Sequence, residues 1–249
     1  MKRVKLVVAY DGTNYCGWQV QKNGETIESV LNRAIGELTG EEIHVMGSSR
    51  TDAGVHACGN VAVFDTEARM AADKFSYALN QRLPEDIRIQ DSCEVPADFH
   101  PRFQKTVKTY EYRILNREFP LPAYRFNSHF TYRNLDVERM RQAAAYLIGE
   151  HDFQSFCAAG AQVKTTVRTI YALDVEKQGD LIILRITGNG FLYNMVRIIA
   201  GTLMKIGQGD WEPERIPEIL AGCDRQLAGP TAPARGLTLM EIHFKGEKG

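Results

Sequence analysis

A carboxylate and a guanidinium lie two positions apart in a short polar loop of this chain. The stretch GSSRTDAGVHACGNVAVF, residues 47–64, places Arg50 and Asp52 between Gly47 and Gly54 and then continues as an apolar segment. Glycines at both positions would allow backbone angles that other residues rarely adopt. Asp52 could cap a turn by accepting a hydrogen bond from a downstream amide, or it could be a catalytic carboxylate on a rigid frame.

A second candidate lies in the segment KTYEYRI, residues 108–114. On a strand, Tyr110 and Tyr112 would share one face. Aromatic rings beside basic residues fit a base-stacking platform, but a core strand whose tyrosine hydroxyls reach the rim fits equally well. Residues 102–117 hold five basic residues against Glu111 alone, a net charge of +4. This segment is either a local nucleic-acid surface or a solvated strand face.

Arg197 is the third candidate. Helical spacing over residues 192–207 predicts one apolar stripe, which comprises Leu192, Met195, Val196, Ile199, Leu203 and Ile206. Arg197 falls on the opposite side, with Tyr193, Gly201 and Met204. Because a solvated face seldom carries these three residues together, this face is predicted to pack on another segment. Arg197 would then be partly buried and would need a carboxylate partner.

Two runs of secondary structure must position these residues. The first half reads as strand, helix, two strands, helix and strand, over residues 3–10, 26–39, 43–48, 60–66, 73–82 and 87–94. The second half repeats this order with insertions, over residues 108–115, 136–147, 166–177, 180–187, 192–207, 213–221 and 236–244. The pattern predicts an α+β fold with two ferredoxin-like (βαββαβ) halves, residues 1–100 and 101–249, whose mainly antiparallel sheets join around a central cleft.

Local signals define several ends of these elements. Thr26 is a predicted N-cap and Gly40 a predicted stop for the first helix. Gln178-Gly179 is predicted to join two strands in a tight hairpin.

Composition narrows the class of protein. The net charge is -1, so any nucleic-acid surface must come from local clustering. The five cysteines form no CxxC pair and the six histidines form no HExxH motif, so neither a disulfide framework nor a metal site is expected. No run approaches the roughly 18 apolar residues of a membrane helix. We therefore expect a cytoplasmic protein.

Four sequence blocks together resemble the tRNA pseudouridine synthase A family. They are YDGTNYCGWQ (10–19), GSSRTDAGVHA (47–57), KTYEYRI (108–114) and GNGFLYNMVRIIAG (188–201). Many members carry another small or aliphatic residue in place of one serine of GSSRTDAG, but the Arg-Thr-Asp core is intact. The resemblance covers nearly the whole chain. It implies isomerisation of uridine to pseudouridine at positions 38, 39 and 40 of the tRNA anticodon stem-loop, by breaking the N1–C1′ bond and rejoining the base through C5.

The resemblance also implies roles for five residues. Asp52 matches the catalytic aspartate and would be the nucleophile, attacking either C1′ or the base. Tyr110 matches the tyrosine that packs on the target base and is a candidate for removing the C5 proton. Arg197 matches the arginine that pairs with the aspartate, and Leu237 matches the leucine that lines the uracil pocket. Arg50 matches the residue that fills the space left by the flipped nucleotide.

The resemblance further implies tRNA as partner, a homodimer, and no metal or cofactor. Two other classes remain open from the residues themselves. A non-enzymatic RNA-binding module would explain the basic segment and Tyr110, but not Asp52 combined with a half-buried Arg197. A small-molecule enzyme on a ferredoxin-like frame would leave the basic segment 102–117 without a purpose.

Overall fold

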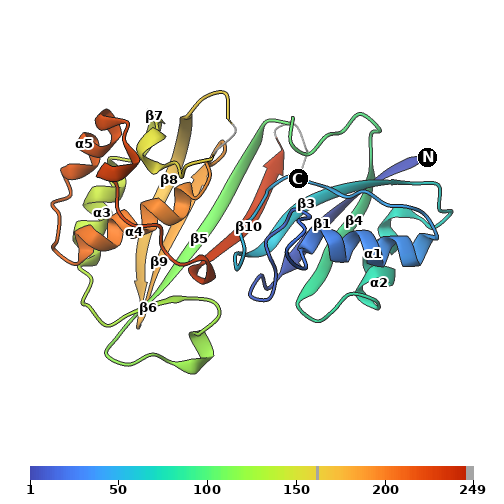
Figure 1. Cartoon of the computed structure of the whole chain (residues 1–249), viewed down its shortest axis with the longest axis horizontal. Helices are drawn as coiled ribbons and strands as arrows, with labels where there is room; N and C mark the ends of the chain where they lie inside the picture. Colours follow the sequence, from blue (N-terminus) through green and yellow to red (C-terminus); the bar gives the residue numbers. More distant parts are fainter. Residues whose placement is uncertain (161–162, 245–249) are drawn as a thin grey trace. The chain divides into compact units, whose positions relative to one another are not determined.

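The computed structural model describes residues 1–160 and 163–244. The chain divides into two compact units (Figure 1): unit 1 comprises Met1–Lys105 with Leu239–Phe244, and unit 2 comprises Thr106–Thr238. Both mix helices with mainly antiparallel strands. The last strand belongs to the second half in chain order. Most of that strand, from Leu239 on, clusters with unit 1 instead.

Unit 1 has the element order expected for the first half. Its elements are β1 (Lys2–Tyr10), α1 (Ile27–Thr39), β2 (Met46–Gly47), β3 (His56–Thr66), α2 (Phe75–Asn80) and β4 (Ile87–Val95), with the 3₁₀ turn η1 (Ala72–Lys74) before α2. The strand order is β4-β1-β3, with β2 also on β3, and every one of these pairings is antiparallel. The strand predicted over 43–48 is reduced to two residues, while β3 begins four residues earlier than predicted.

The last strand, β10 (Leu237–Phe244), follows β3 in the strand order. A Cβ on Gly59 of β3 would lie 2.8 Å from the Met240 carbonyl oxygen, so the two backbones approach closely there. The Phe244 ring also meets Phe99 edge-on, with centroids 5.2 Å apart. These contacts hold the end of the chain in unit 1.

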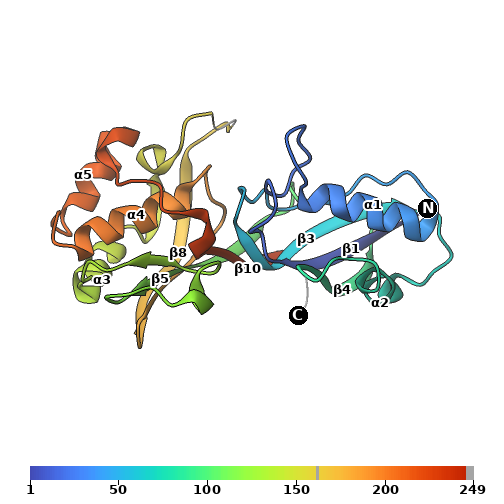
Figure 2. The ribbon, with the colours of Figure 1, turned by 60° about the horizontal axis from the view of Figure 1, so that its bottom comes forward.

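The first helix shows how local signals form an element. Thr26 accepts a hydrogen bond from the Ser29 amide, and the Ser29 hydroxyl accepts one from the Thr26 amide, which closes a capping box. Gly40 ends the helix with φ 75°. The predicted cap and stop are therefore confirmed. The helix lies along β1 and β3 (Figure 2) and buries Ile27, Val30, Leu31, Ala34 and Ile35.

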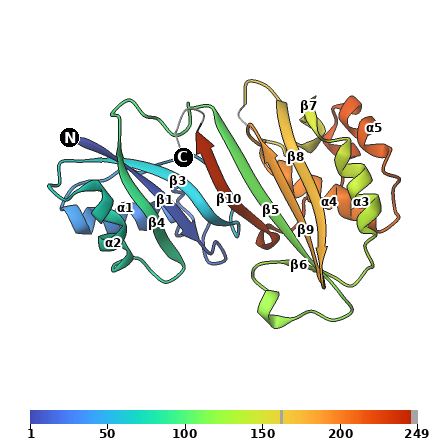
Figure 3. The same cartoon turned by 180° about the vertical axis from the view of Figure 1, so that it is seen from behind.

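Unit 2 is built on a second set of strands. Its elements are β5 (Thr106–Asn116), β6 (His129–Thr131), α3 (Val137–Ala145), β7 (Gly149–Asp152), β8 (Val167–Gln178), β9 (Leu181–Gly188), α4 (Met195–Gly207) and α5 (Arg215–Gly222). Short 3₁₀ turns occupy Pro122–Tyr124, Gln154–Phe156, Arg225–Leu227 and Ala234–Gly236. The order is β5-β9-β8-β7, with β6 parallel to β5, and Figure 3 shows β5, β9 and β8 side by side. Neither β6 nor β7 was predicted.

Two boundaries in unit 2 differ from prediction. Helix α4 begins at Met195 and not at residue 192, because Asn194 has φ 60° and interrupts the helical conformation. The β8–β9 hairpin pairs Gln178 with Leu181, so its two-residue loop is Gly179-Asp180. Gly179 alone has a positive φ, 60°, as a type II′ turn requires at its first central position.

A polar cluster joins the end of α4 to the segment before α3. The Asp210 carboxylate accepts hydrogen bonds from Arg133 at 2.8 Å and from Lys205 at 3.0 Å. These two cations lower the pKa of Asp210 to about 2. The cluster therefore depends on an ionised carboxylate.

Candidate active site

Asp52 opens a tight turn between β2 and β3. The Val55 amide donates to the Asp52 carbonyl oxygen at 3.1 Å, and Gly54 has φ 76° at the third position of the turn. This is the pattern of a type II turn, which favours glycine at that position. Gly54 thus has the conformational role predicted for it, and the Asp52 side chain is half-exposed.

Gly47 is required for a different reason from the one predicted. It is not among the residues with positive φ. A Cβ at this position would lie 2.3 Å from the indole Nε1 of Trp18, which is fully buried. The absence of a side chain therefore lets the start of the loop pack directly on the tryptophan ring. The prediction that both glycines serve unusual backbone angles was wrong for Gly47.

The segment between β1 and α1 braces the Asp52 loop. The Trp18 amide donates to the Thr51 carbonyl oxygen at 3.0 Å, and the Gly54 amide donates to the Tyr15 carbonyl oxygen at 3.4 Å. Gly17 has φ 88°, and a Cβ on it would lie 2.6 Å from the Thr51 carbonyl oxygen. The block YDGTNYCGWQ thus contributes backbone support for the loop.

The same brace continues into helix α1. The amides of Ile27 and Glu28 donate to the carbonyl oxygens of Gly17 and Trp18, at 3.2 and 3.0 Å. Residues 15–18 therefore connect the Asp52 loop to the first turn of the helix.

A buried polar network supports the loop from β1 and β3. The Tyr10 hydroxyl and the Thr51 hydroxyl are 2.8 Å apart. The Asn60 side-chain amide donates to the Tyr10 hydroxyl at 3.2 Å and to the Ser49 carbonyl oxygen at 3.0 Å. Asn60 is fully buried and Tyr10 is 5% exposed. These bonds fix the backbone on both sides of Arg50, whose own side chain is exposed.

In unit 2, Tyr110 lies in the middle of β5. It is 8% exposed and meets Phe191 edge-on, with ring centroids 5.2 Å apart at 84°. Tyr112, two positions on, is fully buried and donates its hydroxyl to the Pro233 carbonyl oxygen at 2.9 Å. Burial raises the pKa of Tyr112, against the opposing charges of Arg197 and a second arginine. Tyr112 fits the core-strand interpretation, with its hydroxyl reaching an adjacent loop.

Arg197 is half-buried, as predicted from its position on the helix. Its Nε donates to the Ala232 carbonyl oxygen and its Nη1 to the Asn194 side-chain oxygen, both at 2.8 Å. A Cβ on Gly201 would lie 1.8 Å from the Pro230 carbonyl oxygen, so the helix packs tightly on that segment. The predicted packing of this helix face is confirmed at Gly201 and Met204, whereas Tyr193, assigned to the same face, is 49% exposed.

Leu237 begins β10 and is 6% exposed. A Cβ on the preceding Gly236 would lie 2.7 Å from the Tyr112 ring. The Tyr112 ring and its bond to Pro233 therefore hold the segment that leads into Leu237.

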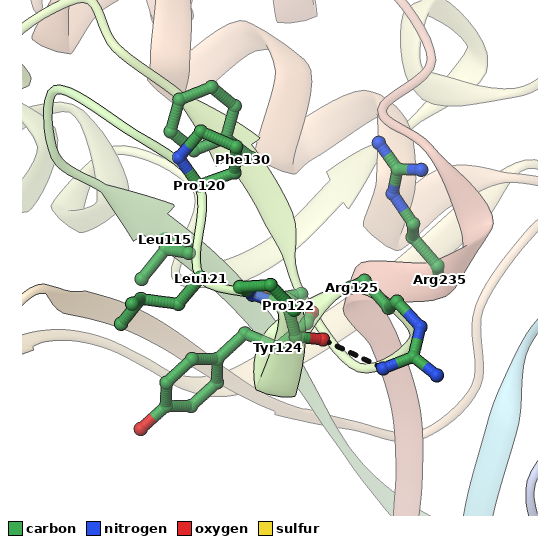
Figure 4. A pocket seen from close by; sticks show the side chains of 9 residues that line it. Leu115, Pro120, Leu121, Pro122, Tyr124, Arg125, Phe130 and Arg235 are labelled. Carbon is green, nitrogen blue, oxygen red and sulfur yellow. Dashed lines mark hydrogen bonds between the residues drawn. The ribbon is translucent and has the colours of Figure 1, made fainter.

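The pocket drawn in Figure 4 has a volume of about 400 Å³ and lies wholly in unit 2. Its lining consists of Leu115, Pro120, Leu121, Pro122, Tyr124, Arg125, Ser128, Phe130 and Arg235. Arg125 donates to the Pro122 carbonyl oxygen at 3.0 Å, drawn as the dashed line in Figure 4. None of the five predicted site residues lines this pocket, although Arg235 is two positions before Leu237.

Two classes of feature are absent from the part of the chain that the structure describes. Within residues 1–160 and 163–244, no three His, Cys, Asp or Glu side chains are grouped so that they could hold a metal ion. Over the same residues, no helix combines the length and apolar character needed to cross a membrane.

Sequence reasoning missed the residues that support the site. It overlooked Tyr10, Trp18 and Asn60 around the Asp52 loop, and it left the role of Tyr112 open. Trp18 and Tyr10 lie in the quoted block at residues 10–19, so their association with the loop had a signal. Asn60 had none, because an asparagine within a strand carries no local pattern that reveals a distant partner.

The chain matches known proteins over almost its full length. The sequence model described as tRNA pseudouridine synthase matches residues 6–104 and 143–245. A protein of Acetivibrio thermocellus named tRNA pseudouridine synthase A is 48% identical over 244 residues, which cover 98% of this chain and 100% of that relative. Proteins of the same name from Ruminiclostridium cellulolyticum and Brevibacillus brevis are 49% and 51% identical over 245 residues, with the same coverage.

Proposed function

The chain belongs to the tRNA pseudouridine synthase family, an isomerase family that acts on uridine in tRNA, and from this premise we propose that its targets are uridines 38, 39 and 40 of the anticodon stem-loop. The N1–C1′ bond breaks, the uracil rotates, and a C5–C1′ bond forms. C5 then loses its proton and N1 gains one, so the product is an isomer of the substrate. This rearrangement requires no redox cofactor.

Asp52 is the proposed nucleophile of this reaction. The observation that carries the proposal is the Asp52 loop itself, where a half-exposed carboxylate lies between backbone groups held by Trp18, Asn60 and the Gly54 turn. A nucleophile must be held in a near-attack geometry, and small displacements are costly to the rate. A loop fixed on both sides meets this requirement, whereas a solvated turn would not need it.

The other four residues take the roles that the family resemblance assigns. Arg197 is proposed as the cation that pairs with the Asp52 carboxylate and holds its orientation, because a planar guanidinium matches carboxylate geometry. Tyr110 and Leu237 are proposed to contact the uracil, which is uncharged and can be held by aromatic and aliphatic surfaces. Arg50 is proposed to fill the space left by the extruded nucleotide.

Extrusion of the target nucleotide is part of the proposal. A base stacked in a stem cannot rotate about its glycosidic position, so it must first leave the stack at a cost of a few kcal/mol. The homodimer and the cytoplasmic location are likewise proposed from the family.

We also infer that the two units are ferredoxin-like. Unit 1 resembles the split βαβ pattern, with strands in the order β4-β1-β3 and the two-residue β2 also paired with β3. In unit 2, β5, α3, β8, β9 and α4 repeat the pattern, with β9 between β5 and β8.

The test is product mapping on tRNA that carries uridine at positions 38–40. We expect Asp52→Ala and Asp52→Asn to bind this tRNA with wild-type affinity and to form no pseudouridine. The matched control is Asp91→Asn, which removes an exposed carboxylate from β4 and should leave product formation unchanged. Pseudouridine formed by Asp52→Ala would refute the nucleophile assignment. Binding with no pseudouridine in the wild-type protein would favour the RNA-binding module instead.

A further inference from the structure

The segment that follows β4 is attached to the start of the Asp52 loop. The Ser48 hydroxyl donates to the Pro101 carbonyl oxygen at 3.0 Å, and the Arg102 Nε donates to the Gly47 carbonyl oxygen at 2.9 Å. Both bonds lie within unit 1. Residues 101–102 therefore keep a fixed position beside the loop that presents Asp52.

This segment displays a preformed aromatic stack. The rings of His100 and Phe103 are 4.1 Å apart at 24°, which is a stacked arrangement. The Arg102 amide donates to the His100 Nδ1 at 3.2 Å, which helps to fix the imidazole. Phe103 is 83% exposed, more than any other large hydrophobic side chain that the structure describes. Covering the free face of this ring with another flat group would remove apolar surface from water and is therefore favourable.

Two guanidinium groups accompany this stack. Burial lowers the pKa of Arg102, the positive charge of Arg50 lowers it further, and a smaller effect of the Glu28 negative charge opposes both. Arg50 and Arg102 are exposed overall, but the Arg102 Nε lies in a part-buried hydrogen bond to the Gly47 carbonyl oxygen. Within residues 1–160 and 163–244, the carboxylates that pair with cations pair with residues other than Arg50 and Arg102, and Glu28 acts on Arg102 only through its longer-range charge. An anion from outside the protein would therefore stabilise Arg50 and Arg102, because it would offset the repulsion between their charges.

A second exposed aromatic ring of unit 1, Tyr77, differs in the charges around it. Lys74 lies 5.6 Å from the ring centroid of Tyr77, which is 71% exposed. Asp73, however, pairs with Lys74 at 2.8 Å and neutralises its charge. Exposure of an aromatic ring near a cation therefore does not by itself make an anion site, and Lys74 of η1 with Tyr77 of α2 serves as an internal comparison.

We propose that Phe103 and His100, together with Arg102 and Arg50, form a platform for one unpaired nucleotide of the RNA substrate. The base stacks on the exposed face of Phe103, and a neighbouring phosphate binds between the two guanidiniums. Arg50 in this arrangement enters the space left by the extruded nucleotide and contacts the phosphate that flanks that space. Unpaired bases are recognised in this way by aromatic rings and arginine in many RNA-binding proteins. The platform rests on the proposed function and makes it more specific: the substrate must offer an unpaired nucleotide close to the target uridine.

The base contact is tested with a hairpin RNA of the anticodon stem-loop type that carries 2-aminopurine at one loop position at a time. We expect Phe103→Ala to weaken binding about 5- to 150-fold and to abolish the fluorescence change at one position. Phe103→Tyr should retain both signals, and Tyr77→Ala should bind as the wild type does. Because Phe103 is so exposed, these substitutions should not unfold the chain. Binding by Phe103→Ala within twofold of the wild type would overturn the platform.

The phosphate contact is tested by the salt dependence of binding. Arg102→Gln and Arg50→Gln should each reduce the slope of log K against log salt concentration by about 0.7, the value for one phosphate contact on a single strand. Arg69→Gln removes an exposed charge elsewhere in unit 1 and should leave the slope unchanged. An unchanged slope in both glutamine variants would overturn the phosphate contact, as would displacement of the hairpin by a poly-aspartate peptide at equal charge.

Product mapping separates this inference from the proposed function. If the wild-type protein makes pseudouridine and the platform variants bind RNA as well as it does, the platform alone is refuted. If the wild-type protein makes no pseudouridine but the platform variants lose RNA binding, the proposed function is refuted and the platform is supported.

Discussion

Replacing Asn60 with alanine tests whether the Asp52 loop depends on support from β3. The Asn60 side chain donates to the Tyr10 hydroxyl at 3.2 Å and to the Ser49 carbonyl oxygen at 3.0 Å, and its oxygen accepts from the Val61 amide at 2.9 Å. Alanine removes all three bonds from a fully buried position, without touching Asp52.

The magnitude follows from these three bonds. Each neutral hydrogen bond contributes a net 0.5 to 1.5 kcal/mol in typical cases, and a buried group left without a partner costs more. We therefore expect Asn60→Ala to lower the free energy of unfolding by about 2 to 4 kcal/mol. The loop should also shift, and a displacement of about 1 Å in a catalytic group can lower a rate by about 100-fold. We expect a single-turnover rate reduced by about 10- to 100-fold.

The matched control is Asn80→Ala in the same unit. Asn80 exchanges two hydrogen bonds with the backbone of Ile89, both at 2.8 Å, and neither involves the Asp52 loop. This variant should lose about 1 to 3 kcal/mol of unfolding free energy and keep its rate within twofold. Urea unfolding measures the first quantity, and single-turnover formation of pseudouridine at a temperature where both variants are folded measures the second. Asn60→Ala that is destabilised but keeps the wild-type rate would refute the proposed dependence of catalysis on this support.

Three other substitutions give separable outcomes. Gly17→Ala should destabilise unit 1 by about 1 to 3 kcal/mol, because φ is 88° and the new Cβ would lie 2.6 Å from the Thr51 carbonyl oxygen; a thermal melt showing no loss would contradict this. Tyr112→Phe removes the bond to Pro233 and should cost about 0.5 to 1.5 kcal/mol in urea unfolding, with a unit 2 that stays folded. Two hydrogen-bonded cations lower the pKa of Asp210 to about 2 in the folded protein, compared with about 3.9 in the unfolded chain. The ionised carboxylate therefore stabilises the fold fully above the unfolded-state pKa, and this stabilisation is lost as pH falls toward 2. Wild type and Asp210→Asn should therefore differ in stability at pH 6 and converge near pH 2, and a constant difference would contradict the assignment.

Much of the local structure could be predicted because its causes lie close together in the chain. The cap and stop of α1 depend on Thr26, Ser29 and Gly40, and the apolar spacing between them is visible in the printed letters. The turn at Gly54 and the hairpin between β8 and β9 have similarly short-range causes. The predicted start of α4 was three residues too early, because Asn194 has a positive φ and precedes the first helical residue.

The candidate site was only partly predictable. The motif around Asp52 identified the loop and its family, and the position of Arg197 opposite the apolar stripe indicated a packed helix face. Nothing near Gly47 in the chain indicates that Trp18 occupies the space of its missing side chain, and nothing near Asn60 indicates that it bonds to Ser49 and Tyr10.

The sequence by itself determined the order of the elements, most of their ends, the catalytic candidates and the family. Tertiary structure decided which residues support those candidates: Asn60 beneath the Asp52 loop, Arg102 on Gly47, and Tyr112 against the segment before Leu237. The physical reason is separation along the chain. Caps, turns and amphipathic periodicity are set by residues within a few positions, whereas buried hydrogen bonds and close backbone contacts join residues that only folding brings together.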